Sequence, residues 1–396
     1  MADTTTTSEA ITETTSELEP QIEHIPTRVL EHVNVAPAQT WNRLRANDIT
    51  LTVPNRSRKG DVYFALPRLF SGVECGMGAE VTSWIVSQAA DARYVEVPAR
   101  SIREEPVVIS VSAAQNEVAD TGIMVREGAE VTIVVAAGTG EADSTSKNPA
   151  VTTCDAPATS ASLLRIIAEA GARVTLIEVI GVGENQQHVE SVGIRASEGA
   201  RVEVHQYALG GGTVAIGFAA ELVGARARID LSLRYLARDT ETLDVNHVVR
   251  QKGRNTRAEI SEYGVLADEA KKSLRATIDL VHGAKGAAGN EAETVLVLGD
   301  KVINKTTPVI LCDEDDVQGN HGATIGSVSP EQLQYLCDRG LSKAEAEQLF
   351  VRAILEDAIM HAPDDASHAV AVARAEAVLG NDLAHDFDDS AKEDLL

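Results

Sequence analysis

A short motif recurs before several apolar segments of the chain, and it limits the possible folds more than any other feature. It reads glycine, alanine, a polar residue and then an apolar residue, and its copies begin at Gly128, Gly171, Gly199 and Gly224. Glycine can adopt the positive φ that a tight corner requires, and the small alanine fits inside that corner. A corner followed by a strand, repeated along the chain, is typical of a β-solenoid.

The region from about residue 92 to 325 has many strand-like runs of Val and Ile, for example residues 107–111, 131–135 and 174–179. Aromatic residues make up only 3% of the chain, so the core must consist of Val, Ile, Leu and Ala. The corner spacings of 43, 28 and 25 residues are irregular. Periodicity therefore favours a parallel β-helix and leaves a β-sandwich or barrel as the alternative.

Residues 140–160 are polar and predict an insertion loop between coils.

The chain is predicted to divide into five parts. Residues 1–25 are rich in Thr, Ser and Glu without an apolar period, which predicts a disordered acidic tail. Residues 26–91 are predicted to form a small N-terminal α/β cap, and residues 92–326 the β-helix core. A C-terminal helical domain is expected over residues 327–382, followed by a second acidic tail at residues 383–396.

Three helices are predicted in the C-terminal part. Ser329 followed by Pro330 provides an N-cap and a favourable first helical residue. Ser342 and Glu345 have the spacing of a capping box, which predicts the start of a second helix. The third helix is predicted over residues 365–379, directly before a glycine.

The formal net charge of −25 argues against nucleic-acid binding, because phosphate recognition needs basic patches. An anionic membrane surface is disfavoured for the same reason. No apolar run reaches the roughly 20 residues that span a bilayer, and the acidic N-terminus does not resemble a signal peptide. We therefore expect a cytoplasmic protein whose four scattered cysteines are free thiols.

Two segments near the C-terminal end carry a family resemblance. Residues 315–326, an acidic pair followed by a His-Gly-Ala-Thr turn, resemble the signature that closes the β-helix of SufD proteins. Residues 334–342, with a tyrosine and then Arg-Gly-Leu-Ser, resemble the link between two C-terminal helices of the same family. Residues 297–308 are similar to the last coils. The chain thus resembles the SufB/SufD family, and its SufD branch most. This resemblance implies a mainly β protein, a right-handed parallel β-helix flanked by a small N-terminal α/β region and C-terminal helices.

The same resemblance implies a function that depends on partners. It implies a non-catalytic scaffold subunit of the SufBCD complex for iron–sulfur cluster assembly, which pairs with a SufB-type subunit through its β-helix. The C-terminal helices would dock the SufC ATPase, with Tyr335, Arg339, Leu349 and Phe350 as candidate contacts. The sequence has no G-x-x-x-x-G-K-[ST] loop of its own, so ATP hydrolysis is expected in the partner.

Three residues are candidate metal ligands. The resemblance implies iron binding or cluster formation near His321, and imidazole suits iron, although a histidine can also hold a turn by hydrogen bonds. Cys312 offers a thiolate but can also be a small buried apolar residue. Glu293 stands where SufB-type subunits carry a sulfur-accepting cysteine, and a carboxylate cannot form a persulfide. It remains a possible hard iron ligand or a solvated strand residue.

Two further positions bear on the mechanism that the resemblance implies. Gly319 stands where SufD relatives often have a cysteine, and Gly322 stands where SufB-type chains have an acid. We expect only a transient iron–sulfur cluster or iron at the interface with SufB, and no tightly bound cofactor. The role of flavin and the choice between homodimer and heterodimer stay open.

Two other classes of protein compete with the scaffold. A carbohydrate-active enzyme built on a β-helix would need clustered acids or bases and aromatic sugar platforms, and the chain has few aromatic residues. A purely structural solenoid is the other alternative. Stable co-purification with an ATPase is expected only of the scaffold.

Overall fold

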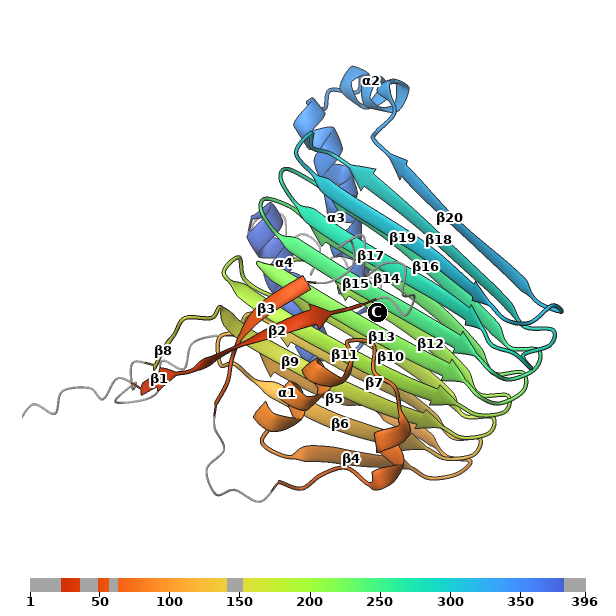
Figure 1. Ribbon diagram of the computed structural model, residues 1–396. Coiled ribbons are helices and arrows are strands. Elements are labelled where there is room, and N and C mark those ends of the chain that lie inside the picture. Colours follow the sequence, from red (N-terminus) through yellow and green to blue (C-terminus); the bar gives the residue numbers. More distant parts are fainter. Residues whose placement is uncertain (1–22, 36–48, 57–62, 141–151, 381–396) are drawn as a thin grey trace, which may run out of the picture.

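The computed structural model describes residues 23–35, 49–56, 63–140 and 152–380, and its centre is a parallel β-solenoid (Figure 1). Two eight-stranded sheets face each other, and successive strands of the chain alternate between them. Every strand in both sheets pairs in parallel with its neighbours. This arrangement confirms the predicted parallel β-helix and excludes the sandwich or barrel, which are built largely from antiparallel pairs.

One sheet, the helix-side sheet, is covered by C-terminal helices. Its strands are β5 (Ile102–Ser112), β7 (Glu130–Gly138), β10 (Arg173–Gly181), β12 (Arg201–Ala208), β14 (Arg228–Ala237), β16 (Arg257–Leu266), β18 (Ala288–Val297) and β20 (Gln318–Gly326). The cap-side sheet is covered by N-terminal elements. Its strands are β4 (Ala92–Val97), β6 (Val118–Val125), β9 (Ala158–Ala168), β11 (Gln186–Ala196), β13 (Thr213–Leu222), β15 (Thr242–Gln251), β17 (Lys271–Leu280) and β19 (Ile303–Cys312).

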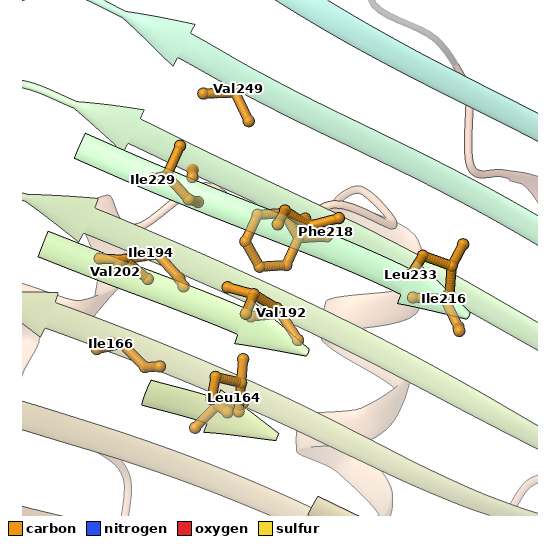
Figure 2. Close-up of a cluster of buried hydrophobic side chains, with 14 of the residues drawn as sticks. Leu164, Ile166, Val192, Ile194, Val202, Ile216, Phe218, Ile229, Leu233 and Val249 are labelled. Atoms are coloured by element: carbon orange, nitrogen blue, oxygen red, sulfur yellow. The ribbon is translucent and has the colours of Figure 1, made fainter. Parts of the chain in front are cut away.

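The space between the two sheets is a long apolar core. Side chains of a strand alternate between its two faces, so every second residue points into the solenoid. Leu164, Val192 and Phe218 occupy one such row, because they are direct register partners in β9, β11 and β13. Figure 2 shows these stacked side chains between the sheets, and all three are fully buried. Burying a side chain of this size stabilises the fold by about 1.5–3 kcal/mol.

The corners between the sheets follow the predicted motif at three of its four copies. Gly128, Gly171 and Gly199 have φ values of 63°, 67° and 64°, and the alanine after each is fully buried. Each of these glycines donates its N–H to the corner of the next coil, for example Gly171 to Glu198 O at 2.8 Å. The corners therefore stack along the solenoid and connect its coils by hydrogen bonds.

The fourth copy of the motif is displaced by two residues from the prediction. Arg226, not Gly224, has the positive φ of 60°, and Ala227 takes the buried corner position. Gly224 is needed for a different reason, since a Cβ at this residue would lie 1.9 Å from the backbone nitrogen of Glu198. The sequence shows a glycine, but it does not show which of two steric demands that glycine meets.

The described N-terminal elements lie on the outer face of the cap-side sheet. They comprise β2 (Thr27–Val33) and β3 (Ile49–Pro54), which pair antiparallel, the short 3-10 helix η2 (Arg68–Gly72) and helix α1 (Ala79–Gln88). Leu30, Val53 and Trp84 from these elements form one buried cluster with Leu163 and Val189 of the sheet. The N-terminal part therefore shares a core with the solenoid.

Two predictions about loops and tails were wrong for part of their length. Glu23–Ile25 form strand β1, which pairs with β8 (Thr152–Cys154), so these three residues of the predicted disordered tail are ordered. Strand β8 and the start of β9 at Ala158 also lie inside the predicted insertion loop of residues 140–160. Backbone pairing between distant segments provides the order that the local sequence does not indicate. Residues 1–22 and the tail at 383–396 lie outside the described residues.

Three C-terminal helices match the predicted ones: α2 (Pro330–Asp338), α3 (Lys343–His361) and α4 (Asp365–Leu379). Ser329 and Ser342 each form a complete capping box at the start of α2 and α3. Helices α3 and α4 bury their apolar residues against the helix-side sheet. Arg374 of α4 fixes this packing, because it pairs with Glu241 and donates to Leu209 O at 2.7 Å.

Candidate functional site: the open C-terminal end of the solenoid

The C-terminal end of the solenoid is formed by the two edge strands β19 and β20. Every residue of β20 is exposed, while in the neighbouring strand β18 the inward-facing residues from Gly289 to Val295 are buried. His321 pairs in register with Glu291 of β18, and Ala323 pairs with Glu293. Since Glu291 and Glu293 belong to the inward-facing row of β18, His321 continues this row at the open end.

The three predicted metal ligands occupy different environments. His321 is exposed on β20, and Cys312 is exposed at the end of β19, where its thiol contacts the carbonyl of Glu314 at 3.3 Å. Glu293 is 1% exposed inside the solenoid. Among the described residues, no three His, Cys, Asp or Glu side chains converge as a metal site would require. The metal-binding roles of these three residues therefore stay predictions.

Both carboxylate oxygens of Glu293 have protein partners. Oε1 accepts from the Tyr235 hydroxyl at 2.7 Å and from the Lys272 ammonium, and Oε2 accepts from the Thr306 hydroxyl at 2.6 Å. Burial lowers the pKa of Lys272, while Glu293 opposes this effect. Glu293 and Lys272 thus form a buried ion pair in which the carboxylate is satisfied without a metal ion.

Two further carboxyl groups lie next to this ion pair. Glu262 and Glu291 are 2% and 3% exposed, and burial together with the nearby acids raises the pKa of each to about 8. Glu262 Oε1 lies 2.8 Å from Nδ1 of His247. The carboxyl groups of Glu262 and Glu291 also hydrogen-bond to each other, and the backbone of Gly322 hydrogen-bonds to Glu291. The solenoid therefore contains an acidic cluster directly behind the open end.

A second polar cluster lies deeper in the solenoid. Ser160 Oγ lies 2.8 Å from Nδ1 of His188, whose Nε2 lies 3.1 Å from Glu190 Oε2. Next to it, Gln206 donates to Glu178 at 2.5 Å. Burial raises the pKa of Glu190 to about 8 and lowers that of His188 to about 3, so both side chains are neutral at pH 7. The chain of contacts from Ser160 through His188 to Glu190 resembles a catalytic triad, but all three side chains are fully buried.

Sequence reasoning did not identify either internal cluster. The available signal was the strand alternation itself, because residues such as Glu178, Glu190 and Glu262 fall on the same strand face as their apolar neighbours Leu176, Val192 and Ile260. An acidic residue in such a row must be buried once the strand is assigned to a solenoid.

The predicted docking residues lie on α2 and α3. Tyr335 is 57% exposed and Leu349 is 40% exposed. The guanidinium of Arg339 lies over the Tyr335 ring at 4.9 Å, a cation–π contact that holds both side chains at the surface. Phe350 instead packs against the apolar cluster between the helices and the helix-side sheet. Their predicted role as partner contacts stays untested.

Helix α2 buries none of its residues, and Cys337 is half-buried. A groove of about 800 Å³ separates this helix and the start of α3 from the ends of β18 and β20. Val297, Ile325 and Leu333 provide apolar surface in the groove, and Lys343 provides a charge. The helix thus stands beside the open end without closing it.

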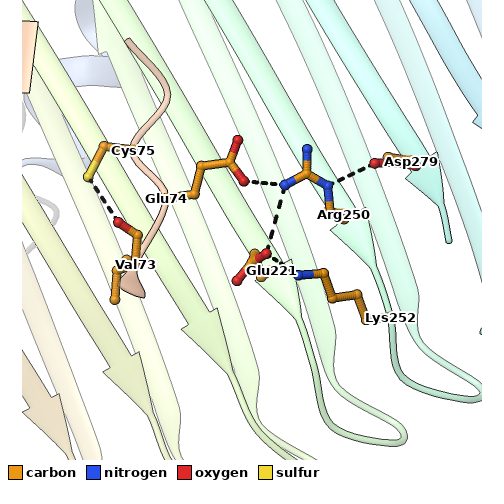
Figure 3. Close-up of polar contacts among 7 residues, drawn as sticks. All are labelled: Val73, Glu74, Cys75, Glu221, Arg250, Lys252 and Asp279. Atoms are coloured by element: carbon orange, nitrogen blue, oxygen red, sulfur yellow. Dashed lines mark hydrogen bonds and ion pairs between the residues drawn. The ribbon is translucent and has the colours of Figure 1, made fainter. Parts of the chain in front are cut away.

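Cys75 belongs to the N-terminal segment that packs on the cap-side sheet, away from the C-terminal helices on the helix-side sheet. Burial raises the pKa of its thiol to about 12, so it is a poor thiolate ligand. Figure 3 shows its neighbour Glu74 in an ion-pair network around Arg250, whose Nε also lies 2.8 Å from Asp279. Glu221 and Lys252 complete the network. These contacts attach the N-terminal segment to the sheet.

This fold and this end define a class of protein: a parallel β-solenoid with one open polar end and a helical layer on one sheet. Residues 108–354 match the family model described as "SUF system FeS cluster assembly, SufBD core domain". Because this match covers more than half of the chain, the chain belongs to the SufBD family. The resemblance indicated by the sequence is thereby confirmed.

Curated relatives agree with this assignment. The iron–sulfur cluster assembly protein SufD of Bacillus subtilis is 35% identical over 111 residues, which cover 28% of this chain and 25% of the relative. A SufBD family protein of Methanocaldococcus jannaschii is 30% identical over 131 residues, or 33% and 40% of the two chains. SufD of Escherichia coli is 22% identical over 157 residues, or 40% and 37%. These alignments thus span between a quarter and two fifths of each relative.

In the part of the chain that the structure describes, none of the helices has the length and hydropathy needed to span a membrane.

Proposed function

We propose that this protein is a cytoplasmic, non-catalytic SufD-like scaffold subunit of an iron–sulfur cluster assembly complex. It pairs with a SufB-type subunit through the open end of its solenoid, and its C-terminal helices dock a SufC-type ATPase. Membership of the SufBD family supports this role over a carbohydrate-active enzyme or a structural solenoid. Iron or a nascent cluster is the cargo of the complex, held transiently near His321 at the interface.

The observation that carries the proposal is the difference between the two ends of the helix-side sheet. At the N-terminal end, β5 carries Arg103, Glu104, Glu105 and Pro106, and its pairing with β7 is irregular there. Charges, proline and irregular pairing are the features that block an edge strand from further pairing. Strand β20 has no Asp, Glu, Lys, Arg or proline, and its pairing with β18 is continuous. The C-terminal edge is therefore suited to accept another strand.

The backbone of β20 also shows which groups are available. Gln318 donates its N–H to Ala287 O on the β18 side. Because successive residues of a strand point their backbone groups to opposite sides, the N–H of Ala323 faces away from β18. A partner strand would use such groups, as in other complexes formed by strand addition.

Substitution of Ala323 tests this interface. Ala323→Pro removes one outward N–H at an edge position that tolerates proline, so the chain still folds. We expect the variant to lose at least tenfold in affinity for a SufB-type subunit, measured by co-purification and calorimetry with purified SufB and SufC proteins. The control Ala323→Ser keeps the N–H and should form the complex normally.

Two results would count against the proposal. If the wild-type chain forms no complex with either partner, the scaffold function is wrong. If Ala323→Pro binds as well as Ala323→Ser, the scaffold function stands but β20 is not the interface.

A further inference from the structure

Helix α2 has an apolar face that the described part of the chain leaves only half covered. Leu333, Leu336 and Cys337 share this face, because helical residues three and four positions apart are neighbours, and each of them is half-buried. Leu333 borders the groove of about 800 Å³ between α2 and the ends of β18 and β20. A helix of 9 residues is too short to be stable in water without tertiary packing. The structure therefore points to a further segment that packs on this face.

The C-terminal end of α4 lies at the border of the same groove. Val378 and Leu379 line a neighbouring hollow of about 190 Å³, and Leu298 lines both this hollow and the groove. Gly380 ends the helix with a φ of 88°, a value that lets the chain leave the helix axis. Residues 381–396, which lie outside the described residues, therefore start beside the groove.

This C-terminal segment carries apolar side chains within reach of the groove. Leu383 and Phe387 are its first large apolar residues, and their spacing of four positions suits packing on one side. An extended chain spans at most about 3.6 Å per residue, so Leu383 can lie up to about 14 Å from Leu379. Neighbouring strands are only about 4.8 Å apart, so the ends of β18 and β20 are within that distance.

We propose that residues 381–396 fold back into the groove, with Leu383 and Phe387 packed between α2 and the ends of β18 and β20. The chain's own segment is favoured over a separate partner, because it starts at the groove and its covalent link gives it a high effective concentration there. The segment thereby holds α2 in place relative to the solenoid.

The charges of the groove indicate that apolar contacts hold the segment. Asp300 and Glu347 line the groove together with Lys343, whose ammonium lies 3.5 Å from Glu347. Residues 381–396 contain 6 acids, which gain little from a groove with these carboxylates. We therefore expect docking to persist at about 1 M salt, where interactions between exposed charges are screened beyond about 3 Å.

Photo-cross-linking in the isolated full chain tests the contact directly. We would replace Phe387 by p-benzoylphenylalanine, irradiate the purified protein and map the products by mass spectrometry. We expect cross-links within one chain, from residue 387 to residues 297–302 or 327–333, at low and at high salt. The control carries the same group at Leu396, beyond the two proposed anchors, and should lose these products.

Hydrogen exchange in α2 provides a second measurement. The double variant Leu383→Ser, Phe387→Ser should make residues 330–338 exchange about tenfold faster, because the apolar face of α2 then loses its cover. The matched control, Leu395→Ser with Leu396→Ser, removes two apolar side chains farther along the same segment and should leave this exchange unchanged.

The outcomes distinguish the possible occupants of the groove. Cross-links between two chains would overturn the intramolecular contact and indicate a second copy instead. Absence of groove cross-links in the isolated chain would also overturn it, as would unchanged exchange in the double variant. Loss of the cross-links only after a SufC-type ATPase is added would support it and show that this partner displaces the segment. Because both measurements use the isolated chain, failure of the complex to form would contradict only the scaffold function.

Discussion

Individual polar residues inside the solenoid are the least expected feature of this protein. The row of the cap-side sheet that contains Leu164 and Val192 in earlier coils contains His247 in a later coil. On the helix-side sheet, Glu262 follows Leu233 in the same way. Such residues are tolerated because each strand offers them partners from the opposite sheet, as Lys272 of β17 does for Glu293 of β18. The consequence is that single substitutions in these rows should have larger effects than those on the outer faces.

Lys272→Met removes one half of the buried ion pair at nearly constant volume. We expect the free energy of unfolding to fall by about 3–5 kcal/mol, because Glu293 would remain buried without its cation. Chemical denaturation followed by circular dichroism measures this change. Lys271→Met, at the exposed residue next to it, is the matched control and should change stability by less than about 0.5 kcal/mol. Equal effects of the two substitutions would show that the ion pair does not contribute as described.

At the level of elements, glycines decide how the N-terminal segment sits on the cap-side sheet. A Cβ on Gly217 of β13 would lie 2.6 Å from the backbone nitrogen of Met77, and one on Gly193 of β11 would lie 2.4 Å from Glu74 O. Asn246 donates to Gly76 O at 3.1 Å across the same contact. The segment of residues 73–78 therefore depends on flat, glycine-lined surface for its close approach.

Gly217→Ala should displace this segment from the sheet. The added methyl group meets backbone atoms that cannot rotate away, so α1 and the segment before it would lose protection while the solenoid remains folded. Hydrogen exchange read by mass spectrometry should show faster exchange over residues 73–88. Gly72→Ala, where the methyl group would meet nothing within 4 Å, is the control. Unchanged exchange in Gly217→Ala would mean that the contact is not needed for docking.

For the whole molecule, the buried ionisable groups link stability to pH. Glu190 has a folded-state pKa of about 8, above its usual 4.5, so the folded state retains a proton that the unfolded state loses. Its contribution to stability is therefore lost as the pH rises towards 8. His188 acts in the opposite direction, because its folded-state pKa of about 3 makes stability fall as the pH drops below 6.5. Above pH 6.5 the buried acids determine the slope.

The free energy of unfolding should therefore decrease between pH 6.5 and pH 8. One group with such a shift contributes up to about 1.4 kcal/mol per pH unit. Glu190→Gln should reduce the slope by about 1 kcal/mol per pH unit, as measured by denaturant unfolding at several pH values. Glu203→Gln, on the exposed outer face of β12, should leave the slope unchanged. A flat profile in the wild type would contradict this account of the buried acids.

The sequence by itself determined the three C-terminal helices and favoured the coil architecture over a sandwich or barrel, because corners, strand alternation and capping boxes are encoded by neighbouring residues. Through its resemblance to the family it also made His321 a candidate metal ligand. The sequence did not reveal the corner shift at Arg226, the pairing of β1 with β8, or the contact between the buried carboxyl groups of Glu262 and Glu291. These depend on which segments lie next to each other. Register partners in neighbouring coils are 26 to 43 positions apart, and those of β1 and β8 are 129 apart, so they leave no local pattern. Only the tertiary structure could place Glu291 behind His321 and leave β20 as an open edge.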